Sequence, residues 1–124
     1  MIKTILVVDD SPDVIYAIKH GLENLGDEYK VIGADSGMQC LQLLENNQIP
    51  DLILLDIMMP EMSGWELFDR LKEKHSWKNI PVVFLTVRTD RLAKNAGTFL
   101  GEDYIEKPFE AIDVKERINN ILKR

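Results

Sequence analysis

Short apolar runs alternate with longer amphipathic segments along the chain, and this alternation limits the fold more than any other feature of the sequence. The runs are rich in β-branched residues, and the central ones are apolar at consecutive positions. Strands that are buried on both faces of a parallel sheet have this pattern. The predicted strands are Ile5–Val8, Tyr29–Ala34, Leu52–Leu55, Val82–Leu85 and Tyr104–Ile105.

The segments between the runs carry apolar residues at helical spacing. Ser11 and Pro12 suit the N-cap and first position of a helix, and Gly26 and Gly97 lie near two expected helix ends. The predicted buried stripes are Val14, Ile18, Leu22 and Leu25; Cys40, Leu41 and Leu44; Leu67, Phe68 and Leu71; Leu92 and Ala96; and Val114, Ile118, Ile121 and Leu122.

The order of elements is therefore strand then helix, five times over. Right-handed crossovers convert this order into an α/β fold, a doubly wound, five-stranded parallel sheet of (βα)5 type. The 124 residues are the size of one ordinary domain, and no linker or internal repeat interrupts the pattern. We expect a single domain over residues 1–124.

Charge and composition exclude several classes of protein. The net charge of -6 disfavours direct binding to nucleic acid, which depends on basic patches. Cys40 is the only cysteine, so there is no disulfide framework and no paired-cysteine metal motif. The first ten residues do not resemble a signal peptide, and no apolar stretch reaches the ~18 residues that span a bilayer. We expect a soluble, cytoplasmic domain without membrane contact.

Polar and charged residues follow four of the five predicted strands. In open parallel sheets, ligands bind beyond the carboxyl ends of the strands, where the strand order reverses. These side chains are therefore expected to converge on one edge of the sheet. They are Asp9 and Asp10 after the first strand, Asp56 after the third, Thr86 after the fourth, and Lys107 with Pro108 after the fifth.

This set of side chains points to phosphoryl transfer. Two carboxylates about 4 Å apart repel by roughly 4 kcal/mol at an effective dielectric constant of about 20, so three of them need a cation or a proton. Mg²⁺ prefers a few carboxylates together with water and phosphate oxygens. Lys107 offers a second cation, and Thr86 offers a hydrogen bond to a phosphoryl oxygen. Phosphoryl transfer depends on such positioning and charge neutralisation.

Four motifs in register carry a resemblance to a known family. The chain resembles the receiver domains of two-component response regulators, the CheY-like family, over its whole length. The resemblance implies a doubly wound fold and a phosphoacceptor function. The motifs are VVDDS at 7–11, LILLDIMMPEMSG at 52–64, FLTVR at 84–88 and DYIEKPF at 103–109.

The resemblance implies a Mg²⁺ site around the acceptor. It makes Asp56 the phospho-acceptor and a metal ligand. It makes Asp10 a direct ligand, whereas Asp9 acts mainly through the water shell of the metal. The backbone carbonyl of Met58 is the third protein ligand that the family would supply.

The resemblance also assigns phosphoryl contacts and a switch. Thr86 and Lys107 are expected to contact the phosphoryl group, and Thr86 is expected to act with Tyr104, the aromatic residue that reorients on activation. The bond between Lys107 and Pro108 is expected to be cis, against a base rate near 5% for such bonds.

Three residues are expected to set the lifetime of the phosphorylated state. The resemblance implies that Met58, Val87 and Arg88 flank the path of the water that would attack the phosphoryl group, and none of them is a general base. Val87 stands where the family favours a small residue, and Glu102 stands where the family commonly has alanine. Slow hydrolysis is therefore predicted.

The implied function is that of a signalling module. A sensor histidine kinase or a histidine phosphotransfer protein would donate the phosphoryl group, and an altered face would then bind an output partner that the sequence does not identify. The domain is itself the substrate, so we do not expect an enzyme with turnover. Phe99 and Leu100 are candidate contacts on that face, and Asp103 and Arg117 partly match positions used in phosphorylation-dependent homodimers.

Two other functions use related chemistry. A haloacid-dehalogenase-type phosphatase shares the aspartate nucleophile and Mg²⁺, but it needs Asp-x-Asp, and here Ser11 stands two residues after Asp9. A flavodoxin-like cofactor binder needs a Ser/Thr/Gly-rich phosphate loop after the first strand. The sequence DDSPD at 9–13 would repel a cofactor phosphate in the absence of a metal.

Overall fold

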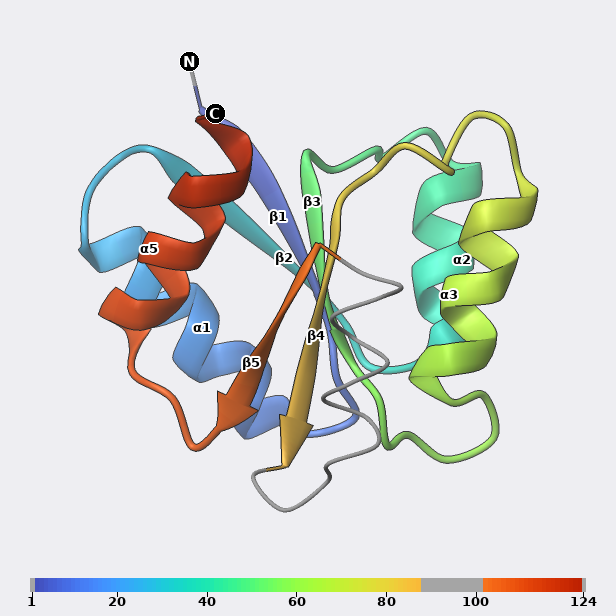
Figure 1. The fold of residues 1–124 in the computed structure, drawn as a ribbon, viewed down its shortest axis with the longest axis horizontal. Helices are drawn as coiled ribbons and strands as arrows, with labels where there is room; N and C mark the ends of the chain where they lie inside the picture. Colours follow the sequence, from blue (N-terminus) through green and yellow to red (C-terminus); the bar gives the residue numbers. More distant parts are fainter. Residues whose placement is uncertain (1, 88–101, 124) are drawn as a thin grey trace.

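The computed structural model describes residues 2–87 and 102–123, which form one parallel sheet covered by helices on both faces (Figure 1). The predicted α/β class is confirmed. The expected helix around Leu92 and Ala96, its end near Gly97, and the candidate residues Arg88, Phe99 and Leu100 lie outside the described residues. The elements are β1 (Lys3–Val8), α1 (Pro12–Asn24), β2 (Tyr29–Ala34), α2 (Gly37–Glu45), β3 (Leu52–Asp56), α3 (Gly64–Glu73), β4 (Val82–Val87), β5 (Asp103–Lys107) and α5 (Ala111–Leu122).

The strands are all parallel and lie in the order β2-β1-β3-β4-β5. The chain moves outward from β1 to β2 and then crosses back to β3, so the order reverses between β1 and β3. The helices α2 and α3 cover one face, and α1 and α5 cover the other (Figure 1). This arrangement buries the central strands on both faces, which explains their unbroken apolar sequence.

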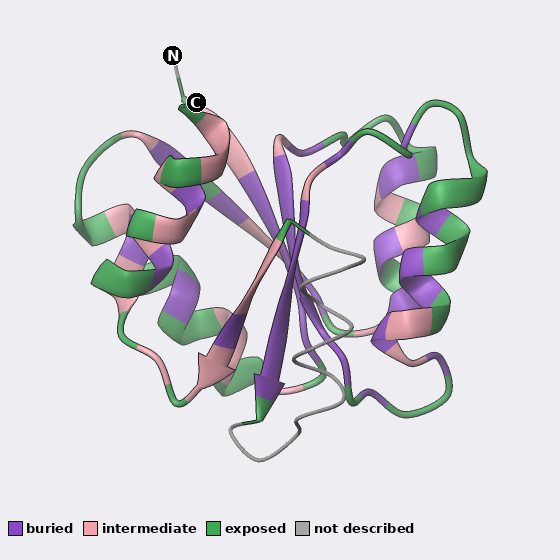
Figure 2. Ribbon diagram, viewed as in Figure 1, coloured by how far each residue is buried: buried purple, intermediate pink, exposed green. Residues whose placement is uncertain are grey.

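Each face of the sheet has its own apolar core. Figure 2 shows that buried residues run along the central strands and recur on the helices beside them. Alternate residues of β1 enter opposite cores, because successive side chains of a strand point to opposite faces: Leu6 and Val8 pack toward α2 and α3, while Ile5 and Val7 pack toward α1 and α5. Cys40 is wholly buried in the first core, as its place on an apolar stripe predicts.

Serine hydroxyls cap the first three helices. The hydroxyl of Ser11 accepts from the N–H of Val14, and Pro12 occupies the first position of α1, as predicted. Ser36 and Ser63 cap α2 and α3 in the same way. Among the described helices, the longest has 13 residues, and none is both long enough and apolar enough to cross a membrane.

One predicted core position is wrong. The sequence places Leu25 on the buried stripe of α1, but the helix ends at Asn24 and Leu25 is its C-cap, with 40% of its surface exposed. The backbone N–H of Leu25 donates to the carbonyls of Gly21 and Leu22. Gly26 follows with a φ of 147°, so the chain turns away from the helix axis at this point.

Candidate functional site

The acidic residues lie where the strand order reverses. Asp9 and Asp10 follow the end of β1, and Asp56 is the last residue of the neighbouring strand β3. Adjacent parallel strands end at the same edge of the sheet, so these side chains meet although 47 positions separate Asp9 from Asp56. The sequence prediction that they converge is confirmed.

The three carboxylates form a compact cluster. One oxygen from each of Asp9, Asp10 and Asp56 lies within 4.8 Å of the others. Asp9 is fully buried and Asp56 is 5% exposed, whereas Asp10 is exposed. The N–H of Ser11 donates to Asp9 over 2.9 Å and fixes the orientation of its carboxylate. The cluster is therefore buried on one side and open to solvent through Asp10.

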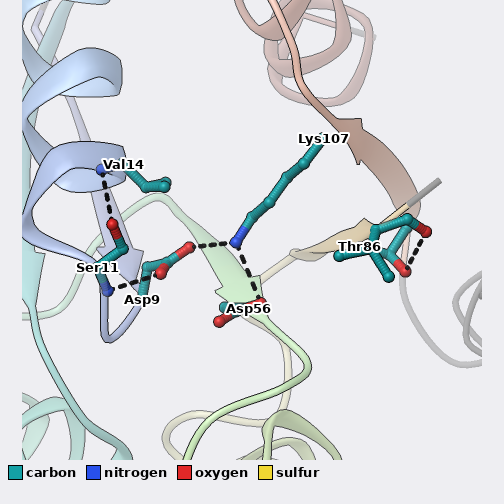
Figure 3. Close-up of polar contacts among 7 residues, drawn as sticks. Asp9, Ser11, Val14, Asp56, Thr86 and Lys107 are labelled. Carbon is teal, nitrogen blue, oxygen red and sulfur yellow. Dashed lines mark hydrogen bonds and ion pairs between the residues drawn. The ribbon is translucent and has the colours of Figure 1, made fainter.

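Lys107 joins two of these carboxylates across the sheet. It is the last residue of β5, and its Nζ lies 2.8 Å from Oδ2 of Asp9 and 3.3 Å from Oδ1 of Asp56 (Figure 3). To make both contacts, the side chain extends past the end of β4, which lies between β5 and β3 in the sheet. The three acids and the ammonium carry two net negative charges.

Burial and charge shift the titration of this group. Burial raises the pKa of Asp56 to about 6, repulsion from Asp9 adds to the rise, and Lys107 opposes it. Burial acts to lower the pKa of Lys107, but the hydrogen bond to Asp9 and the charges of Asp56 and Asp9 outweigh it and raise that pKa. The lysine is therefore a permanent cation at neutral pH, and Asp56 is ionised at some energetic cost.

The donor set fits a hard divalent cation. Three carboxylates within 4.8 Å of one another supply oxygen ligands, and the exposure of Asp10 leaves room for water. The two net negative charges of the four side chains match the charge of Mg²⁺. The site is therefore compatible with a Mg²⁺ ion held by Asp9, Asp10 and Asp56.

Comparison with known proteins identifies the family of this chain. The family of response regulator receiver domains matches residues 5–119. The chain belongs to the response regulator receiver family. This family acts in two-component phosphoacceptor signalling and is not a classical enzyme family, which decides against the phosphatase and flavodoxin-like alternatives.

Relatives of the receiver domain occur in proteins with different outputs. The chain is 40% identical to histidine kinase P4 of Formosa agariphila over 97% of its own length and 8% of that protein. It is 37% identical to the transcriptional regulatory protein PhoP of Bacillus subtilis over all of its length and 50% of PhoP. The chain thus spans half or less of the length of these curated relatives.

A solved receiver structure shares the fold along the entire chain. The N-terminal domain of a response regulator receiver protein from Methanoculleus marisnigri is 41% identical. The match covers 100% of this chain and 99% of that one, with a TM-score of 0.76. The chemotaxis protein CheY4 of Vibrio cholerae gives a TM-score of 0.86 at 26% identity over 98% of this chain and 100% of that one. The predicted fold is confirmed by both.

Thr86, the predicted phosphoryl contact, has its hydroxyl bonded to the backbone of the next residue. It is buried within β4, and its hydroxyl donates to the carbonyl of Val87 over 3.3 Å (Figure 3). The sequence pattern places Thr86 and Lys107 just after two strands. In the structure β4 extends to Val87 and β5 to Lys107, so both residues lie within strands. The bond between Lys107 and Pro108 is cis, as expected.

Of the three residues proposed to set the lifetime of the phosphorylated state, the structure describes Met58 and Val87. Met58 is 68% exposed and Val87 is 47% exposed, so both apolar side chains lie largely at the surface. The backbone N–H of Met58 donates to the carboxylate of Asp56. Tyr104 is half-buried and packs against the core beside α3.

Two positions that support the site escaped sequence reasoning. The N–H of Ser11 orients Asp9, although the sequence indicates only the capping role of the Ser11 side chain. A Cβ at Gly64 would lie 2.4 Å from the backbone oxygen of Asp56, so the start of α3 rests directly against the backbone of Asp56. The only signal in the sequence is the place of Gly64 at the end of the LILLDIMMPEMSG motif.

Proposed function

We propose that this receiver domain, over residues 1–124, accepts a phosphoryl group on Asp56. The observation that carries the proposal is the convergence of Asp9, Asp10 and Asp56 within 4.8 Å, with Lys107 bound to two of the three. We assign Asp56 as the nucleophile, because it ends the central strand β3 and its side chain is 8% exposed.

The donor is a phosphohistidine of a sensor histidine kinase or of a histidine phosphotransfer protein. A carboxylate oxygen of Asp56 forms a bond to phosphorus while the bond between phosphorus and the histidine nitrogen breaks, and its electron pair stays on the imidazole. Lys107 keeps its proton and donates hydrogen bonds to the phosphoryl oxygens, as does the Thr86 hydroxyl once it turns from the Val87 carbonyl. The domain is consumed as a substrate and does not turn over an external one.

Asp10 and Asp56 hold Mg²⁺ directly in this proposal, together with the backbone carbonyl of Met58, and Asp9 holds it mainly through water. When bound, the ion neutralises the carboxylates and the oxygens of the phosphoryl group. The exposure of Asp10 and the burial of Asp9 support this division of roles.

Labelling with a small phosphodonor tests the acceptor. Acetyl phosphate with Mg²⁺ should add one phosphoryl group, detected by intact mass, and EDTA should prevent it. Asp56→Asn should abolish labelling and Asp10→Asn should weaken Mg²⁺ binding. Asp13→Asn is the matched control, because Asp13 is exposed in the first turn of α1 and outside the cluster. Labelling of Asp56→Asn at the wild-type level would show that the assignment is wrong.

The output of the domain is proposed to be a switch at Thr86 and Tyr104. As the Thr86 hydroxyl moves to the phosphoryl group, it vacates space into which Tyr104 turns, and the face around β5 and α5 changes its affinity for an output partner. The half-buried state of Tyr104 supports this proposal. Unchanged NMR signals around Tyr104 after addition of beryllofluoride, a phosphoryl mimic, would refute it.

A phosphorylation-dependent homodimer through the same face is part of the proposal. Asp103 and Arg117 form an ion pair of 2.9 Å within the chain, and Arg117 also donates to the carbonyl of Tyr104. This network joins β5 to α5, so movement of Tyr104 would alter the charges presented there. Sedimentation with and without beryllofluoride tests the dimer, and an unchanged mass would refute it. We further propose that the domain works in the cytoplasm, where its kinase donor would act.

A further inference from the structure

An aromatic cluster joins the start of α3 to the centre of β4. The ring centroids of Trp65 and Phe84 are 4.7 Å apart, and those of Phe68 and Phe84 are 5.3 Å apart. The two ring planes are inclined by 48° in each pair. Phe84 is fully buried, whereas Trp65 is half-buried. Tilted rings at these separations attract one another beyond the effect of burial alone.

The backbone beside Trp65 is fixed to the backbone of the acceptor. The N–H of Gly64 donates to the carbonyl of Ile57 over 2.9 Å. The contact is so close that a Cβ at Gly64 would approach the oxygen of Asp56 to 2.4 Å. Because no side chain intervenes, a displacement of the backbone at Asp56 is passed directly to the first turn of α3, where Trp65 lies.

The other side of the cluster reaches Tyr104. Phe84 and Tyr104 are register partners in β4 and β5, so their side chains lie next to each other on one face of the sheet. Thr86 is two residues beyond Phe84 and lies on that same face. Trp65 and Tyr104 both pack against the core that contains Phe84.

We propose that Trp65 is a positioning residue of the switch, which couples the state of Asp56 to Tyr104 through the ring of Phe84. The inference rests on the proposed function and adds a second route to the one through Thr86. Trp65 is not one of the three residues of the carboxylate cluster, and its described ring contact is with Phe84, so we assign it an effect on the switch equilibrium and not on the transfer reaction.

Intrinsic fluorescence gives a direct test, because the chain has two tryptophans in different surroundings. Trp77 is 5% exposed and lies beyond the end of α3, under the ammonium of Lys74. In Trp77→Phe protein, which keeps only Trp65, Mg²⁺ with beryllofluoride should shift the emission spectrum. In Trp65→Phe protein, which keeps only Trp77, the spectrum should stay unchanged. The opposite pattern would overturn the proposal.

A second test reads Tyr104 itself through fluorine NMR of protein labelled with fluorotyrosine, with Tyr104→Phe to assign the signal. Trp65→Leu should lower the equilibrium constant for the switch with beryllofluoride by about fivefold, equivalent to about 1 kcal/mol, because it removes one ring contact. Trp65→Phe retains a ring and should recover most of the response. Tyr16, which is 65% exposed on α1, provides an internal control signal.

Labelling of Asp56 by acetyl phosphate is measured in parallel, so that the two proposals are separated. If Trp65→Leu is labelled normally and Tyr104 responds as in wild type, Trp65 has no positioning role and the phosphoacceptor function stands. If wild-type protein is neither labelled nor responsive, the proposed function is wrong and this inference fails with it. Should Trp65→Leu fail to fold, the fluorescence comparison still decides.

Discussion

Lys107 reaches Asp56 from two strands away, with 3.3 Å between Nζ and Oδ1. The same ammonium lies 2.8 Å from Asp9, whose side chain has no exposed surface. The lysine therefore already neutralises part of the negative charge that a divalent cation would balance, and the two cations would share the same carboxylates. This sharing makes the contribution of Lys107 measurable.

Replacing Lys107 by methionine should destabilise the metal-free domain and strengthen its binding of Mg²⁺. The variant leaves Asp9 and Asp56 without their ammonium partner, and breaking such a buried pair costs roughly 3 kcal/mol. Loss of one positive charge near the site should tighten Mg²⁺ binding by about tenfold. Labelling by acetyl phosphate should become slower. Urea unfolding in EDTA and Mg²⁺ titration measure the first two effects.

Lys123→Met is the control for this experiment. Lys123 follows the C-terminal end of α5 and pairs with Glu28 on the surface. The Lys123→Met variant should leave Mg²⁺ binding unchanged. If Lys107→Met bound Mg²⁺ no more tightly than wild type, the two cations would not compete for these carboxylates.

The raised pKa of Asp56 predicts a pH dependence of stability in the absence of metal. A carboxyl whose pKa rises from 3.8 to about 6 on folding binds protons more readily in the folded state. The free energy of unfolding should therefore fall as pH rises from about 4 to 6, by about 3 kcal/mol, and then stay level. Asp56→Asn removes this ionisation and should be more stable than wild type above pH 6.

The measurement is urea unfolding in EDTA at a series of pH values, with Asp13→Asn as an exposed control. Below pH 4, wild type and Asp56→Asn should differ little, because Asp56 is protonated in both folded and unfolded states. A constant difference between the two proteins across this range would contradict the assigned shift.

Gly64→Ala and Gly37→Ala form a matched pair, because each glycine is the first residue of a helix. An added Cβ at Gly64 meets backbone, 2.4 Å from the oxygen of Asp56 and 2.8 Å from the Cα of Ile57. At Gly37 the nearest atom is the Sδ of Met62, at 2.5 Å, and this side chain is flexible.

Gly64→Ala should therefore destabilise the domain by about 1–3 kcal/mol and slow the labelling of Asp56, since the backbone at Asp56 must shift. Gly37→Ala should cost less than about 1 kcal/mol and leave labelling unchanged. Equal losses of stability in the two variants, measured by urea unfolding, would show that the contact with Asp56 is not the cause.

The sequence predicted the convergence of the carboxylates because strand order and strand ends follow from local patterns. It did not predict the direction of the Thr86 hydroxyl, which depends on a side-chain rotation toward the Val87 carbonyl. Leu25 kept the helical spacing and yet lies outside the core, because the helix ends one residue earlier. The contact of Trp65 with Phe84 joins two elements far apart in sequence, and its geometry depends on how α3 packs on the sheet.

The last prediction concerns the lifetime of phosphorylated Asp56. Hydrolysis needs a water in line with the bond between phosphorus and the Asp56 oxygen. Met58 and Val87, which are 68% and 47% exposed, are proposed to border this approach, and their apolar side chains cannot orient water by hydrogen bonding. Arg88, outside the described residues, is proposed to complete the set. Hydrolysis should be about tenfold slower than in receivers that have an amide side chain at the position of Met58 and a carboxylate at the position of Arg88. This factor corresponds to about 1.4 kcal/mol in the barrier.

The experiment is a time course of phosphate loss from wild type, from Val87→Ala and from the double variant Met58→Asn/Arg88→Glu. Both variants should lose phosphate faster: Val87→Ala because it opens the approach, and the double variant because it adds groups that hold and polarise the attacking water. Met38→Asn is the control, since Met38 is 55% exposed on α2 and is not part of the proposed site. It should match wild type. If neither variant lost phosphate faster than wild type, access of water past Met58 and Val87 would not limit hydrolysis. The lifetime would then depend on the contacts of Asp56, Thr86 and Lys107 with the phosphoryl group.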